Sequence, residues 1–91
     1  MISHRSFTYL IKKELKKKQQ DLEQVENDIS SLEKKKAALE IEMAKPEVYA
    51  DAVKLEALNK DYAAFQAKEG ALNIRWEKLA EEIESLEMEL S

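Results

Sequence analysis

The fold is decided by the stretch Ala-Lys-Pro-Glu-Val-Tyr-Ala-Asp (residues 44–51), which separates two long stretches of regularly spaced apolar residues. Pro46 disfavours helical geometry at the preceding residue and lacks a backbone N–H, so a first helix is predicted to end near residue 45. Asp51 can accept hydrogen bonds from free backbone N–H groups and is the expected N-cap of a second helix. Val48 and Tyr49 are apolar enough to close the end of the space between the helices. Because the connection is short, the two helices are predicted to run antiparallel.

Apolar residues recur with heptad spacing on both sides of this turn, as they do in coiled coils. Before the turn they form two series, which are Leu15, Leu22, Ile29 and Met43, and Ile11, Val25, Leu32 and Leu39. After the turn the series are Leu58, Phe65, Leu72, Leu79 and Leu86, and Leu55, Tyr62, Trp76, Ile83 and Leu90. We call the interface that these series would form the seam. The pattern predicts an all-α fold, a two-helix antiparallel coiled-coil hairpin.

The expected organisation follows from where this pattern begins and ends. Helix one is expected over residues 9–45, the turn over 46–50 and helix two over 51–90, within a hairpin domain of residues 7–91. Residues 1–6 show no apolar periodicity and are expected to be a flexible tail or the remnant of a linker. Thr8 is the expected N-cap of helix one.

The composition agrees with long helices rather than a thick core. Charged residues make up 37% of the 91 residues, with a single Gly and a single Pro, which is typical of coiled coils. No apolar run approaches the roughly 18 residues of a membrane span, so no membrane partner is expected. Cysteine is absent, which excludes a disulfide scaffold and a thiolate metal site and is compatible with a cytoplasmic location.

Charged residues interrupt the seam at Lys18, Lys36 and Glu69. In one register Val25 faces Trp76, and Lys36 and Glu69 lie in adjacent layers. A shift by one heptad instead places Lys18 against Trp76 and Glu69 against Val25. An unpaired charge in the seam is costly, so we favour the first register and predict that Lys36 and Glu69 are close enough to pair.

Aromatic residues of helix two fall in the same apolar series. Trp76, Tyr62 and Phe65 are therefore predicted to be core residues rather than platforms for stacking bases, with Trp76 largely buried near Val25. Tyr49 lies in the turn, where it either closes the hairpin or contacts a partner.

Three motifs occur in a fixed order along the chain: Phe-Thr-Tyr (residues 7–9) followed by Lys-Glu-Leu (13–15), the turn itself, and Arg-Trp-Glu-Lys-Leu (75–79). Together they resemble the C-terminal domain of ABC-F proteins, whose turn reads Ala-Asp-Pro-Glu-Leu-Tyr-Ala. The resemblance covers residues 7–90. Two departures are Lys18-Gln19, where family members often have Leu-Pro, and Lys45 in place of Asp, so that the turn loses its expected N-cap.

The resemblance implies that this domain belongs to a longer protein, whose ATP-binding cassettes hydrolyse ATP and are its partners. It also implies work on ribosomes, and some family members bind DNA through this domain. The chain itself is not expected to be an enzyme or to hold a cofactor, because its only glycine, Gly70, cannot supply a Gly-rich phosphate loop. Its only histidine, His4, has no second His or Cys with which to bind a metal or catalyse.

Basic residues gather in two places, although the net charge is -4. Lys12, Lys13, Lys16 and Lys17 fall on one side of helix one and form what we call the basic ridge, with Arg5 near the same end. Lys34, Lys35, Lys45 and Lys54 are expected around the tip of the hairpin. We predict that these residues contact phosphates of DNA, ribosomal RNA or transfer RNA without reading bases.

Two alternatives stay open at this point. The lysines of the basic ridge also offset the glutamates at the opposing helix end, which would keep the rod dissolved without any partner. The domain would then be a structural coiled-coil spacer or a protein–protein contact. Leu10, Ile41 and Ile74 would provide apolar surface for it, which gives a monomer or weak self-association.

Overall fold

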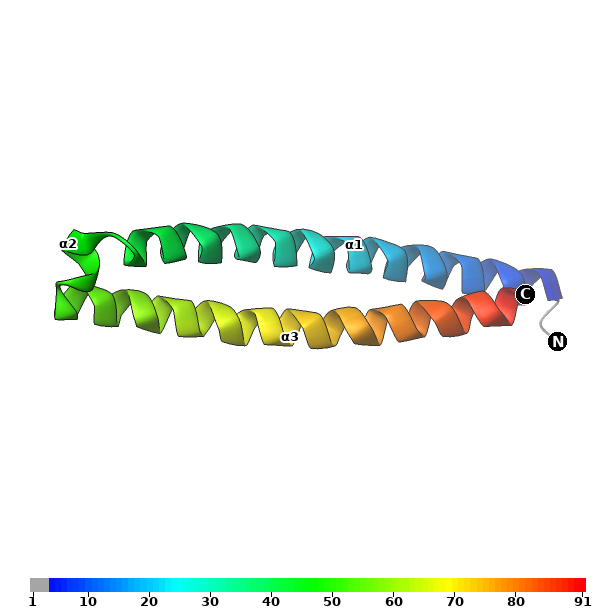
Figure 1. Cartoon of the computed structure of the whole chain (residues 1–91). Helices are drawn as coiled ribbons and strands as arrows, with labels where there is room; N and C mark the ends of the chain where they lie inside the picture. The colour runs from blue at the N-terminus through cyan, green and yellow to red at the C-terminus, as the bar shows by residue number, and fades with distance from the viewer. Residues whose placement is uncertain (1–3) are drawn as a thin grey trace.

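The computed structural model describes the backbone of residues 4–91 and the side chains of residues 7–91. The chain forms helix α1 (His4–Met43), the short helix α2 (Pro46–Tyr49) and helix α3 (Ala52–Leu90), and this described part contains no strand. Figure 1 shows α1 and α3 side by side as a helical hairpin, with α2 at one end and the start of α1 beside the end of α3 at the other. The molecule is a rod that measures 71 × 16 × 15 Å.

The seam forms the interface between α1 and α3. Its buried members are Ile11, Val25 and Leu32 on α1 and Leu79 and Ile83 on α3. The other apolar members of the heptad series are half-buried, with the exception of Trp76. Each long helix has one long partner, so a seam residue is covered mainly from one side. This explains why no large side chain among the described residues is completely buried.

The turn is a short helix rather than an irregular loop. Pro46 begins α2, where its missing N–H costs nothing. Lys45 precedes it with φ -71 and ψ 133, the extended geometry expected of a residue before proline. The Lys45 side chain makes no capping hydrogen bond to α2, as the departure from the Asp of the family turn predicts. It lies instead 2.9 Å from Glu42 Oε2.

Asp51 caps α3, as predicted. Its Oδ1 accepts hydrogen bonds from the backbone N–H groups of Val53 at 3.1 Å and Lys54 at 3.2 Å. Val48 is buried and closes the end of the seam, whereas Tyr49 is 58% exposed. Val48 therefore closes the hairpin as predicted, whereas Tyr49, for which closing the hairpin and contacting a partner were both left open, does not close it.

The start of α1 differs from the expected one. The helix already includes His4, five residues before the expected start near residue 9, so Thr8 lies inside α1 and is not its N-cap. Neither Gly nor Pro occurs in this segment to stop a helix from extending beyond the first seam residue. Residues 4–6, expected in a flexible tail, are thus helical.

Charged residues within the seam find partners across it. Lys36 Nζ lies 3.3 Å from Glu69 Oε1, which confirms the prediction that these two residues pair. Lys18 Nζ forms an ion pair with Glu82. Both contacts fit the favoured register, because the register shifted by one heptad would bring Lys18 to Trp76 instead.

Trp76 corrects the sequence analysis, since 38% of it is exposed and the prediction of a largely buried side chain was wrong. Its Nε1 donates a hydrogen bond to Glu26 Oε1 at 3.1 Å. An indole N–H needs a polar partner, and a carboxylate beside the seam provides one only when the ring lies at the edge of the interface. Because Glu26 is the chain neighbour of Val25, the position of Trp76 along α1 still agrees with the favoured register.

Tyr62 and Phe65 are half-buried in the seam. Tyr62 Oη donates to Glu40 Oε1 at 2.8 Å, which raises the pKa of the tyrosine above its ordinary value because the hydrogen bond favours the neutral phenol. Neither α1 nor α3, over residues 4–91, contains a segment apolar enough to cross a membrane.

Candidate nucleic-acid interface

The four lysines of the basic ridge project from the first third of α1. Lys12, Lys13, Lys16 and Lys17 are all exposed. An α-helix turns by about 100° per residue, which places Lys13 and Lys16 on the side of α1 opposite the seam residue Ile11 and Lys12 and Lys17 on the two flanks of that side. The ridge therefore points away from α3 and is open to a partner along its length.

The positive charges of the basic ridge are not neutralised by ion pairs with neighbouring carboxylates in the described part of the chain. Among the ion pairs formed by residues 7–91, none involves Lys12, Lys13, Lys16 or Lys17. Lys12 and Lys16 are four residues apart, as are Lys13 and Lys17, so like charges are neighbours on one face of the helix. Such an arrangement slightly disfavours the helix on its own and favours any bound anion.

Lys18, the next basic residue along α1, is used differently. It sits at the seam, where its hydrogen bond to Glu82 raises the pKa of the lysine and lowers the pKa of the carboxyl. Lys18 therefore links α1 to α3 through this ion pair. The ridge therefore ends at Lys17.

The structure does not gather the second predicted group around the tip. Lys45 and Lys54 do lie beside α2, but Lys34 and Lys35 lie on α1 about eight to nine residues before its end, or roughly 13 Å along the helix. Lys45 is already paired with Glu42. Lys54 lines an open apolar groove with Glu42, Val48, Ala57 and Leu58.

Arg5 belongs to α1, but its side chain lies outside the described ones, so its predicted role stays a prediction. The side chain of His4 also lies outside the described ones. Among the described residues, no group of three or more His, Cys, Asp or Glu side chains is placed to hold a metal ion.

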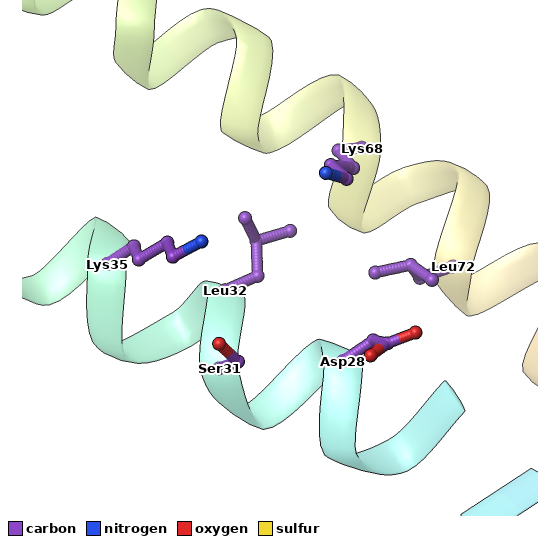
Figure 2. Close-up of a pocket in the computed structure, with 6 residues that line it drawn as sticks. All are labelled: Asp28, Ser31, Leu32, Lys35, Lys68 and Leu72. Atoms are coloured by element: carbon purple, nitrogen blue, oxygen red, sulfur yellow. The ribbon is translucent and has the colours of Figure 1, made fainter. Parts of the chain in front are cut away.

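One basic residue was missed by the sequence analysis. Lys68 on α3 lies across an open groove from Lys35 on α1, and the groove is lined by Asp28, Ser31, Leu32, Lys35, Lys68 and Leu72 (Figure 2). The signal was present, because Lys35 and Lys68 each directly precede a charged seam residue, Lys36 and Glu69. Once these two are expected to pair, their neighbours on the same flank are expected to meet as well.

Residues 13–81 match the family described as the ABC transporter C-terminal domain. The matched segment includes most of α1, the turn and most of α3. No curated protein and no solved structure matches the chain significantly.

Proposed function

The chain belongs to the ABC transporter C-terminal domain family, and from this premise we propose that it is the accessory C-terminal domain of an ABC-F ATPase that binds nucleic acid. The three ABC-F motifs described above support the narrower family. In this proposal, ATP hydrolysis belongs to the cassettes of the parent protein in the cytoplasm, and the present domain is not an enzyme.

The observation that carries the proposal is the basic ridge. Four exposed lysines cover the outer side of α1 and its flanks, and no carboxylate of the described residues pairs with them. A lysine ammonium contacts phosphate as a point charge. The expected binding is therefore to the backbone of DNA, ribosomal RNA or transfer RNA, without selection of base sequence.

The rod shape suits this task. We propose that α1 and α3 pack as an antiparallel coiled coil, which is supported by burial at heptad positions and by charged pairs across the seam. Such a rod holds the ridge at a fixed distance from the tip. The domain then contacts a long duplex or a folded RNA along its side.

The test is a titration of fluorescently labelled duplex DNA and structured RNA with the purified domain at several salt concentrations. Counterion release predicts an affinity that falls linearly with the logarithm of salt concentration. No measurable binding at about 50 mM salt to either nucleic acid would send us to the alternative of a spacer. An affinity that holds or rises with added salt would point to apolar protein contact instead.

That alternative rests on a specific observation of its own. Leu10, Ile41 and Ile74 are exposed apolar side chains on the outer surfaces of the long helices. They lie far apart along the rod, because about 30 residues of α1, or roughly 45 Å, separate Leu10 from Ile41. Scattered apolar residues of this kind are normal on protein surfaces, so we prefer the nucleic-acid interface.

A further inference from the structure

The groove between Lys35 and Lys68 has the make-up of an anion site. Figure 2 shows the two side chains extending from α1 and α3 toward the same space over Leu32. The hydroxyl of Ser31 lines the same groove and can donate a further hydrogen bond. Two lysines from opposite helices and a serine on α1 therefore line the same groove.

This meeting of like charges contrasts with the other charged contacts across the seam. Lys36 faces Glu69 and Lys18 faces Glu82, so each lysine within the seam has a carboxylate as its partner. Lys35 and Lys68, one position away, take part in no ion pair of the described residues. Like charges facing one another across a helix pair destabilise it, and an anion between them would remove that repulsion.

The surroundings of the groove strengthen such an interaction. Leu32 is buried and Leu72 is half-buried, so the base of the groove is apolar and attraction to a bound charge is screened less than on an open surface. Asp28 is the one acidic group in the lining. Its Oδ1 accepts a hydrogen bond from Gln24 Nε2 at 2.9 Å, and Figure 2 shows its carboxylate directed away from the two lysines.

The groove and the basic ridge lie along the same rod. Lys17 and Lys35 are separated by about 18 residues of one helix, or roughly 27 Å, which corresponds to about eight base pairs at 3.4 Å each. Eighteen residues make five full turns at about 100° per residue, so Lys17 and Lys35 project from the same side of α1, and a duplex along that side can reach both. A duplex of about 16 base pairs is long enough for both contacts at once.

We propose that Lys35 and Lys68, with Ser31, form a second phosphate site across the two helices that holds a backbone phosphate of the nucleic acid bound at the basic ridge. The inference rests on the function proposed above and adds a site formed by both helices. The bound phosphate would bridge α1 and α3, so binding also ties the two helices together.

The experiment compares the wild-type domain with Lys35→Gln/Lys68→Gln and with the matched control Lys60→Gln/Lys78→Gln. The control removes the same charge from exposed positions of α3 that do not line the groove. For a duplex of about 16 base pairs, the groove variant should lower the slope of log affinity against log salt by about two units, and the control should leave it unchanged.

A second variant, Lys68→Glu, separates binding from folding. It places a carboxylate opposite Lys35, so the melting temperature should rise while the affinity for the duplex falls. Inorganic phosphate, compared with chloride at equal ionic strength, serves as the small-anion probe in an amide NMR titration. Phosphate should shift amides near Ser31 and Lys68 in the wild type and not in the groove variant, and the duplex should shift the same amides.

The outcomes distinguish the two proposals. A groove variant that behaves like its control, while the wild type binds with a steep salt dependence, overturns the second site and leaves the basic ridge standing. Groove amides that respond to phosphate but not to the duplex also overturn it, because the site would then take a free anion only. Wild-type protein that binds neither duplex nor structured RNA removes both proposals together.

Discussion

Lys36 on α1 and Glu69 on α3 interrupt the apolar seam in adjacent layers, and Lys36 Nζ lies 3.3 Å and 3.4 Å from the two carboxylate oxygens of Glu69. The lysine also lies over the ring of Tyr62, with its Nζ 5.3 Å from the ring centroid. Side-chain exposure is 17% for Lys36 and 26% for Glu69, so both side chains are largely covered by the two helices. Removal of either charge should therefore change the stability of the hairpin.

Glu69→Gln should destabilise the hairpin by about 1–3 kcal/mol, between the values for exposed and for buried pairs, because it leaves Lys36 in the seam without a counter-charge. The double variant Lys36→Met/Glu69→Leu should recover that loss, since apolar residues of similar size fit the seam. Urea denaturation followed by circular dichroism measures both. A single variant as stable as the wild type would show that the pair contributes nothing to folding.

The position of Trp76 leads to a prediction about both its emission and its contribution to stability. The ring is half-exposed, so Trp76→Ala should cost about 1–2 kcal/mol, less than the 3–5 kcal/mol of a fully buried aromatic. Trp76→Phe should cost less again, because it keeps much of the contact and loses the hydrogen bond to Glu26. Emission should be partly quenched by acrylamide. A fully protected, blue-shifted tryptophan would contradict the observed geometry.

Trp76 also shows what heptad spacing does not predict about a residue of the seam. Heptad spacing predicts which residues face the partner helix, and the buried side chains Val25, Leu32 and Leu79 follow it. Heptad spacing carries no information about the size of the indole ring or about its need for a hydrogen-bond acceptor. With one partner helix, those two properties hold the ring at the edge.

The turn was predictable because its signals are local. Pro46 ends the first helix and Asp51 starts the next through contacts that span only a few residues. The position of Lys35 opposite Lys68 depends on the register between α1 and α3, and no local sequence signal specifies this register. It became visible only when the seam pair beside it was in place.

Asp51→Ala should destabilise the hairpin by about 1 kcal/mol, a typical cost of losing an N-cap. The carboxylate accepts from the N–H groups of Val53 and Lys54, which have no acceptor within α3. Asp51→Asn keeps an acceptor oxygen and should stay close to the wild type. Thermal melts of the three proteins test this, and equal loss in both variants would indicate a role for the charge rather than the cap.

The Lys18–Glu82 ion pair makes stability depend on pH. The hydrogen bond from Lys18 lowers the pKa of Glu82 in the folded state below its ordinary value. A carboxyl with a lowered folded pKa contributes stability above its unfolded pKa, and this contribution is lost as pH falls through the folded pKa. Carboxyl NMR should find Glu82 titrating below the exposed glutamates. In Lys18→Gln its pKa should return toward the ordinary value, and an unchanged titration would mean that the pair does not form in solution.

The last prediction concerns the basic ridge. Replacing Lys12, Lys13, Lys16 and Lys17 together by Gln should weaken binding to duplex DNA or structured RNA, and it should flatten the plot of log affinity against log salt by about three to four units on B-DNA. Each lysine that neutralises a phosphate releases condensed counterion, so the slope counts the contacts that are lost. Helix content and melting temperature should change little, because exposed substitutions usually stay within about 0.5 kcal/mol each.

A smaller pair of variants controls for net charge in that experiment. Lys13→Gln/Lys17→Gln removes two lysines from the ridge, and Lys60→Gln/Lys78→Gln removes two from the exposed surface of α3. The ridge pair should lower the slope by about two units and the α3 pair by close to none, because only contacts with phosphate release counterion. Sequence preference should be the same in every variant, since lysine contacts to the backbone read no base edges. Equal changes of the salt slope in the two double variants would mean that binding depends on net charge alone. The basic ridge would then not be the interface.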